Sequence, residues 1–338
     1  MGLWVLLAAS FLLAGCGGTP TGQRVRPRGG VAAYRTTSAV PAAPPRFFAA
    51  TSVWNTPLAP SAVRAPDSAR VTTLLLEAVR EEQAGRRGPW ISTIGFSTPL
   101  YTVPADQPVV RVHLENVNPA LQEAFAAVPL PAGARPAAGT DAQLTVLQPA
   151  SDRLWEFWRL AHAADGWHAR WGGAMRHVSG NAGVFTAGAW PGASTHWGAT
   201  STSLPLVAGL ITLADVRQRR IDHALALGFP RIERGVLRWP AQRSDGTVEG
   251  AAGIPAGTRF RLDPKLDLRA LSMPPLVRMI AQAAQRFGLI VRDRSGVVDF
   301  YGEDPTPTGT NPFAALLGGE RPWQQLALFP WEHLEAIR

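Results

Sequence analysis

The chain has 338 residues, a formal net charge of +8 and a single cysteine. One cysteine excludes an internal disulfide and any zinc or iron–sulfur site built from several thiolates. With 46% hydrophobic and 17% charged residues, the composition is that of a folded protein rather than a disordered one. Arginine accounts for 32 of the 33 basic residues, and this skew indicates a high-GC coding bias more than selected phosphate binding.

The N-terminal segment, residues 1–15, is apolar and carries no charged side chain. It is too short to span a bilayer as a helix and is typical of a signal-peptide core. Its end, Leu13-Ala14-Gly15-Cys16, resembles the lipobox of bacterial lipoproteins. The resemblance implies cleavage before Cys16 and lipid attachment to its thiol, which would anchor the protein to the outer face of the cell membrane. An ordinary secretory signal followed by a chance cysteine is the alternative.

Residues 16–46 are rich in Gly, Pro, Thr and Ala and show no apolar periodicity, which predicts a lipidated, disordered tether. The tether holds five arginines and no acidic residue, so only +3 of the net charge belongs to residues 47–338. The basic excess would therefore lie beside the membrane, where arginine meets anionic headgroups. We expect the membrane, through the lipid, as a partner and no nucleic acid.

Residues 47–338 are predicted to form a single globular domain. Helical spacing of apolar residues predicts helices at 67–83, 119–128, 213–219, 274–287 and 324–337. Alternation and turn residues predict strands at 109–114, 142–148, 153–160, 166–171, 200–213, 221–229, 258–262, 289–292 and 297–301. Runs of strands with few helices between them favour an α+β fold with a mainly antiparallel, jelly-roll-like β-sandwich core and three or four peripheral helices.

Tryptophan and histidine are concentrated between residues 155 and 197, which contain six of the twelve Trp and four of the seven His. Strand alternation places Glu156, Trp158, Trp167 and Trp171 on one face and Trp155 on the opposite, core face. Flat indoles beside a carboxylate suit a sugar ring, and His196 and Trp197 extend this substrate-binding set. The alternative is that these Trp residues fill the second side of a two-sided core.

Glycosidase chemistry requires two carboxylates on either side of the scissile bond. Glu156 is the predicted acid/base, with Asp141 or Asp222 as its partner and His223 beside the latter. A polysaccharide lyase would instead use a Tyr or His base and an Arg or Asn to neutralise a uronate, and the residues that could supply these groups are His168, Arg170, His177, Asn181, His196 and Tyr301. The sequence contains no H-E-x-x-H, G-x-S-x-G, Walker or G-x-G-x-x-G pattern, so we expect no metal, nucleotide or other cofactor.

Residues 171–179, 196–200, 220–227 and 296–304 are similar to blocks in uncharacterised secreted or lipid-anchored proteins of high-GC actinobacteria. This resemblance implies an extracytoplasmic location and a single-domain body, and it implies no activity. The leading hypothesis is a cell-surface lipoprotein that binds or cleaves polysaccharide. The rival is a non-catalytic envelope protein that binds a protein or glycan partner and uses its Trp cluster as core.

Overall fold

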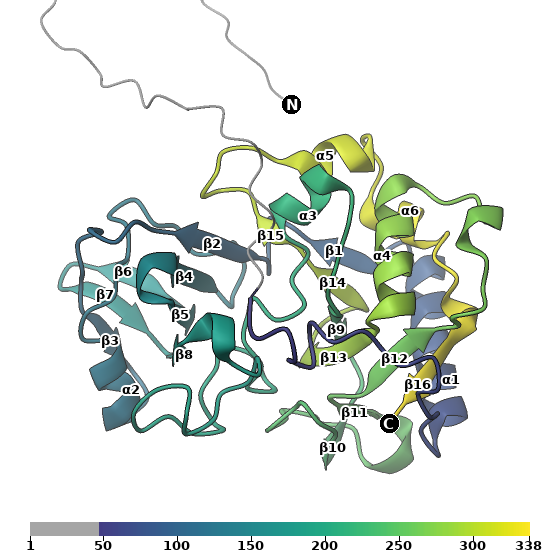
Figure 1. The fold of residues 1–338 in the computed structure, drawn as a ribbon, viewed down its shortest axis with the longest axis horizontal. Coiled ribbons are helices and arrows are strands. Elements are labelled where there is room, and N and C mark those ends of the chain that lie inside the picture. The colour runs from purple at the N-terminus through teal and green to yellow at the C-terminus, as the bar shows by residue number, and fades with distance from the viewer. Residues whose placement is uncertain (1–46) are drawn as a thin grey trace, which may run out of the picture. The chain divides into compact units, whose positions relative to one another are not determined.

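A computed structural model describes residues 47–338 of the chain, and Figure 1 shows their arrangement. This part contains six α-helices and sixteen strands, which form four sheets. The predicted mixture of helices and strands is confirmed. Cys16, the predicted signal peptide and the predicted tether lie outside the described residues.

The largest sheet has six strands, in the spatial order β1 (Trp90–Ser92), β14 (Asp299–Tyr301), β9 (Leu225–Phe229), β13 (Leu289–Arg294), β12 (Arg259–Leu262) and β16 (Leu334–Ile337). Because side chains alternate along each strand, the sheet divides its apolar residues between two clusters. Leu225 and Val291 belong to the cluster that includes the helices α1 (Ser68–Ala84) and α4 (Pro275–Arg286). Ala226 and Ile290 belong to a second cluster, which they share with the five-stranded sheet.

The five-stranded sheet has the order β15 (Glu303–Asp304), β2 (Thr98–Thr102), β4 (Leu144–Gln148), β5 (Arg153–Trp158) and β8 (Trp171–Arg176). Gly302 lies between β14 and β15, so a single residue leads the chain from the larger sheet into this one. The two sheets accordingly lie side by side in Figure 1. The smaller sheets are formed by β3 (Val112–Leu114), β7 (Gly166–Ala169) and β6 (Ala161–Ala163), and by β10 (Ile232–Leu237) and β11 (Ile254–Ala256).

The two long helices form where the sequence predicts them. In α1, Val71, Leu75, Ala78 and Val79 are buried at helical spacing. In α4, Pro275 opens the first turn and Gly288 follows the end with a φ of +87°, a backbone angle that favours glycine. The short helices are α2 (Pro119–Ala124), α3 (Leu213–Gln218), α5 (Pro312–Leu317) and α6 (Pro322–Leu326). Within residues 47–338, none of the helices combines the length and apolar character needed to cross a membrane.

Strand direction differs from the prediction of a mainly antiparallel core. Six of the twelve strand pairings are parallel, including β9 with β13 and β2 with β4. Parallel neighbours require crossover connections, and here long irregular segments as well as helices provide them. The prediction of a mainly antiparallel core is therefore wrong, and the jelly-roll-like sandwich stays a prediction.

The predicted strand at 200–213 is wrong, because residues 197–210 form a buried irregular segment, and only Ile211 makes an isolated bridge. Pro205 has no N–H to donate to a ladder. Gly209 has a φ of +70°, and a Cβ there would lie 2.2 Å from the Ala226 nitrogen. Side chains from both large sheets bind the polar backbone groups of this segment instead. The apolar composition of residues 200–210 correctly indicates that they are buried, but it does not show whether their backbone forms a strand.

Two further element predictions are wrong. The predicted C-terminal helix at 324–337 is interrupted by Pro330, after which β16 pairs antiparallel with β12. The predicted strand at 166–171 is two strands in different sheets, β7 and β8. As a result Trp167 lies opposite Val112 in the three-stranded sheet and does not share a sheet face with Trp158.

Among the buried carboxyl groups, burial raises the pKa of four to about 7: those of Glu82, Glu156, Asp299 and Glu303. Asp299 is the simplest of these to alter. Its two carboxylate oxygens accept hydrogen bonds from the backbone N–H of Ser92 at 3.1 Å and from the Ser92 hydroxyl at 2.6 Å. An amide can replace this carboxyl with little change in shape.

We predict that Asp299→Asn is more stable than the native protein at pH 8, and that this gain in stability is smaller at pH 5. The folded-state pKa lies above the unfolded value, so the folded protein holds its proton longer and stability is lost as pH rises from about 4 to 7. Asparagine removes that loss, which is on the order of 2–4 kcal/mol. Thermal melts at both pH values should show the variant-minus-native difference in Tm increasing with pH. A difference that stays constant or falls contradicts the prediction, and Ser92→Ala, which removes a donor, should lower Tm at pH 8.

Candidate functional site

Glu156 is fully buried in β5, between the five-stranded sheet and the segment 197–210. Its Oε1 accepts the backbone N–H of Ala199 and its Oε2 accepts that of Leu206, both at 2.7 Å. Burial raises the pKa of this carboxyl to about 7, while the two N–H donors and the nearby guanidinium groups of Arg292 and Arg243 act in the opposite direction. Both oxygens are therefore engaged in holding backbone, and neither is exposed to solvent.

Arg292 of β13 holds the same segment from the larger sheet. This side chain is fully buried, and its Nη1 donates to the carbonyl oxygens of Leu206 at 2.6 Å and Ala208 at 3.0 Å. Its guanidinium carbon lies 4.0 Å from the ring centroid of Tyr301. The peptide groups of Leu206 are thus bound by Glu156 on the N–H side and by Arg292 on the carbonyl side. Tyr301 is buried against this guanidinium.

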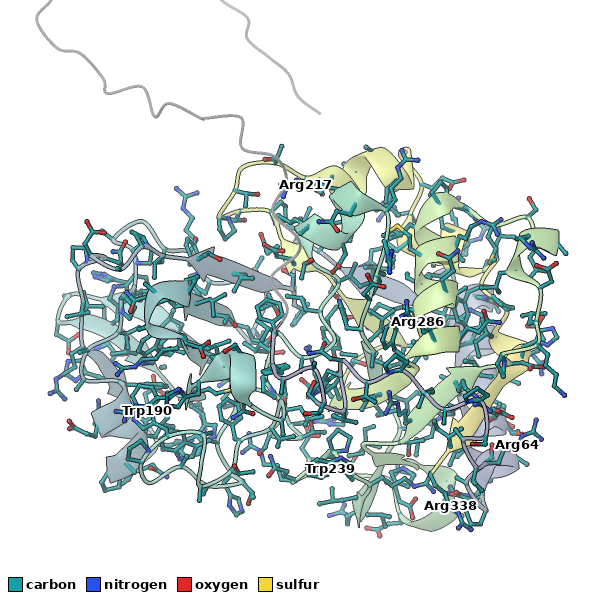
Figure 2. The ribbon with its side chains drawn as sticks, viewed as in Figure 1. Arg64, Trp190, Arg217, Trp239, Arg286 and Arg338 are labelled. Carbon is teal, nitrogen blue, oxygen red and sulfur yellow. The ribbon has the colours of Figure 1, made fainter. Side chains whose placement is uncertain are left out.

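Several of the clustered Trp residues belong to the interior. Trp197 is fully buried, Trp155 donates from Nε1 to the Ala124 carbonyl, and Trp167 is buried beside His162. Trp190, labelled in Figure 2, contacts Trp155 edge to face with ring centroids 5.9 Å apart. These four side chains fill the apolar cluster around the five-stranded sheet.

Trp158 and Trp171 are different, because both are partly exposed and lie opposite each other on β5 and β8. Trp158 donates from Nε1 to Asp141 Oδ1 at 3.0 Å, and Trp171 donates from Nε1 to the carbonyl of exposed His196 at 2.9 Å. Both indole N–H groups are therefore bonded, which fixes the orientation of the rings. We name Asp141, Trp158, Trp171 and His196, together with Arg159 and Arg170, the Trp158 patch.

Two arginines complete this patch: Arg170, which the sequence offers as a group that could neutralise a uronate, and Arg159, which was not singled out from the sequence. The guanidinium carbons of Arg159 and Arg170 lie 4.8 and 5.7 Å from the Trp158 ring centroid, and both side chains are exposed. Arg159 also donates its backbone N–H to the Asp141 carbonyl at 2.7 Å. A flat apolar ring, a carboxylate and two exposed cations thus meet at one edge of the sheet. The signal available in the sequence was the flanking of Trp158 and Trp171 by Arg159 and Arg170.

Asp222 and His223 are placed elsewhere, between α3 and β9. Asp222 pairs with Arg220 at 2.7 Å and with Arg286, labelled in Figure 2, at 3.3 Å. The Nε2 atom of His223 lies 3.2 Å from the Asp215 carboxylate. Burial of His223 opposes protonation, but Asp215 outweighs it and raises the pKa of the imidazole above its usual value. Glu156 and Asp222 share no hydrogen-bond or ion-pair partner. The assignment of Glu156, Asp141, Asp222 and His223 to catalysis stays a prediction.

The comparisons with known proteins add no assignment. No protein-family model matches the sequence, and neither the curated proteins nor the solved structures give a match. Among residues 47–338, no group of three or more His, Cys, Asp or Glu side chains is arranged to hold a metal ion. The Trp158 patch is therefore the candidate site on its geometry alone.

We predict that Glu156→Gln lowers the free energy of unfolding by about 1–3 kcal/mol, because an amide nitrogen would face one of the two backbone N–H groups and leave it without an acceptor. Urea denaturation measures the loss, and amide hydrogen exchange should accelerate at Ala199 or Leu206. Thr145→Val is the matched control. Thr145 lies directly opposite Glu156, and its buried hydroxyl has no partner, so its removal should cost less than about 0.5 kcal/mol. Equal losses in the two variants would contradict the holding role of Glu156.

Proposed function

We propose that this chain is a lipid-anchored, extracytoplasmic protein that binds polysaccharide through the Trp158 patch. The observation that carries the proposal is the pair of partly exposed indoles, Trp158 and Trp171, held by Asp141 and by the His196 carbonyl. An indole fixed in this way presents a flat apolar face to the C–H groups of a sugar ring. Arg159 and Arg170 are exposed and can leave the indole to bind sugar hydroxyl or carboxylate groups.

The proposal is for binding without cleavage. A glycosidase needs two carboxyl groups that both reach the sugar, roughly 5–9.5 Å apart. Asp141 borders the Trp158 patch, but Glu156 is sealed behind residues 197–206 with both oxygens bonded to backbone. This geometry favours the non-catalytic hypothesis. That hypothesis allowed either a protein or a glycan as the partner. We favour a glycan, because the exposed indoles of the Trp cluster have flat faces that can stack on sugars.

We also propose that the two larger sheets act as layers of an open, sandwich-like body. Support comes from the segment 197–210, which Glu156 of the five-stranded sheet and Arg292 of the six-stranded sheet bind from either side. In this arrangement the Trp158 patch lies at β8, the edge strand of its sheet. A long glycan chain can pass along such an edge.

We predict that Trp158→Ala and Trp171→Ala each weaken retention on immobilised polysaccharide roughly tenfold, because each removes about 1–2 kcal/mol of aromatic contact. Affinity electrophoresis against a panel of neutral and acidic polysaccharides measures retention. Both variants should lower Tm by less than Trp155→Ala does, because Trp158 and Trp171 are partly exposed. Trp155→Ala is the control and should lower Tm, since Trp155 is buried. Loss of retention in step with loss of Tm, or no retention of the native protein by any polysaccharide, would refute the site.

The lipid anchor is a separate prediction. Metabolic labelling with an alkyne fatty acid should label the native protein, and Cys16→Ser should lose the label because the acyl chains attach to that thiol. Fractionation should move the variant from the membrane pellet to the soluble fraction. Undiminished label in Cys16→Ser would exclude lipidation at this residue without affecting the polysaccharide prediction.

A further inference from the structure

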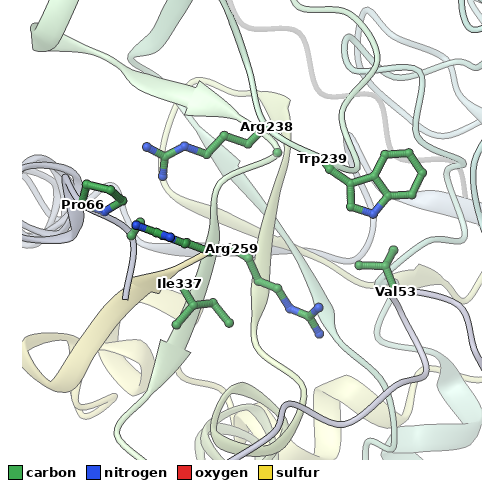
Figure 3. Close-up of a pocket in the computed structure, with 9 residues that line it drawn as sticks. Val53, Pro66, Arg238, Trp239, Arg259 and Ile337 are labelled. Atoms are coloured by element: carbon green, nitrogen blue, oxygen red, sulfur yellow. The ribbon is translucent and has the colours of Figure 1, made fainter. Parts of the chain in front are cut away.

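A cavity of about 350 Å³ lies away from the Trp158 patch, where five separate parts of the chain meet. They are the lead-in segment before α1, the start of α1, the end of β10, the start of β12 and the end of β16. The side chains that matter here are Val53, Pro66, Arg238, Trp239, Arg259 and Ile337, shown in Figure 3. The volume falls in the range of sites that bind small molecules.

Arg259 is a cation in this cavity without a carboxylate beside it. Its Nε donates to the Phe287 carbonyl at 3.1 Å, and Nη2 donates to the same oxygen. Burial lowers the pKa of this guanidinium to about 10, with no acidic side chain of the described residues acting against it. An anion in the cavity would offset this unfavourable burial of charge.

Arg238, the neighbouring arginine, does not play the same part. Its Nη2 pairs with the carboxylate of Asp67, and Figure 3 shows its guanidinium turned toward Pro66 and away from Trp239. Arg259 instead extends toward the side of the cavity where Val53 lies. Arg338 also lines the cavity, and Arg259 is the arginine that Figure 3 shows directed toward the apolar side.

Trp239 forms the outer rim on that side, and 63% of its surface is exposed. Figure 3 shows its indole above Val53, so that the two side chains form an apolar wall. An exposed, flat aromatic next to a cavity is unusual for a side chain that serves only packing. It offers a surface for a ring carried by the anion.

We propose that this cavity binds a carboxylate carried on a six-membered ring, with the carboxylate at Arg259 and the ring against Trp239 and Val53. Guanidinium is suited to carboxylate because its N–H groups form charge-assisted hydrogen bonds in a planar fork. The ring belongs either to a uronate sugar or to an aromatic acid, since both have a flat apolar face. The site shares no residue with the Trp158 patch, so its argument does not depend on the proposed function.

The test uses D-glucuronate and benzoate as probes, with glucose and benzyl alcohol as their neutral counterparts. Titration calorimetry on the whole chain should show at least one acid binding roughly tenfold or more tightly than its neutral counterpart. Arg259→Gln should abolish this preference. Trp239→Ala should weaken binding of the acid roughly fivefold while Tm stays unchanged, because the side chain is mostly exposed. Leu328→Ala, an exposed apolar side chain that belongs to neither the cavity nor the Trp158 patch, is the matched control and should bind the acid as the native protein does.

Stronger binding of glucuronate identifies a sugar acid and stronger binding of benzoate an aromatic acid. The proposal is overturned if neither acid binds, if the neutral counterparts bind equally well, or if a folded Arg259→Gln variant keeps the native affinity. If Arg259→Gln does not fold, two other measurements test the proposal. They are the ratio of the native protein's affinities for the acid and for its neutral counterpart, and the affinity of Trp239→Ala for the acid. Unchanged affinity in Trp239→Ala would then overturn it.

Discussion

The structure depends on one buried residue, Leu206, whose backbone is bound by opposite charges from two sheets. Its N–H donates to Glu156 of β5, and its carbonyl accepts from Arg292 of β13. The two charges do not pair directly, and each gains hydrogen bonds from a segment that has no strand ladder of its own. A buried irregular segment is tolerated only when its polar backbone groups find such partners. The two sheets are therefore joined through polar bonds as well as through the single residue Gly302 between β14 and β15.

Burying Glu156 and Arg292 around residues 197–210 costs free energy, and we call this set of buried polar groups the polar layer. Arg292 keeps two nitrogens, Nε and Nη2, without hydrogen-bond partners, and the Thr145 hydroxyl opposite Glu156 is also unpaired. Burying ionised groups costs free energy unless they are well bonded, and replacing them with apolar groups is often neutral or stabilising. The layer is thus better understood as fixing a particular path for residues 197–210 than as a net source of stability. That path determines which part of the Trp cluster is covered, since it seals Glu156 and Trp197 and leaves Trp158 and Trp171 partly exposed.

The local periodicity of the sequence predicts strand faces and the two long helices. It does not predict features that depend on contacts between distant segments. Alternation correctly placed Glu156 and Trp158 on one face and Trp155 on the other, because all three lie in the single strand β5. Helices α1 and α4 followed their apolar spacing. The parallel pairings could not be predicted, because they depend on the path by which the chain crosses back to the sheet between two strands. For the same reason, apolar composition did not distinguish the irregular segment 197–210 from a strand. The arrangement of the candidate site could not be predicted locally: Asp141 contacts Trp158, Trp167 lies in another sheet, and the covering of Glu156 depends on contacts 43 and 50 residues away in sequence.

The positions of the arginine side chains give the excess of arginine over lysine a second interpretation. A coding bias supplies arginine everywhere, and most positions show an ordinary use, such as the pairing of Arg286 with Asp222 or the packing of Arg176 over the buried Trp190. Arg159 and Arg170 are exposed beside a partly exposed indole, and Arg259 lies unpaired in a cavity rimmed by another. A guanidinium and a flat apolar ring together match a ligand that carries a carboxylate on a ring. If both surfaces select for that chemistry, one class of acidic sugar suits both, and the positions of Arg159, Arg170 and Arg259 reflect binding rather than codon usage alone.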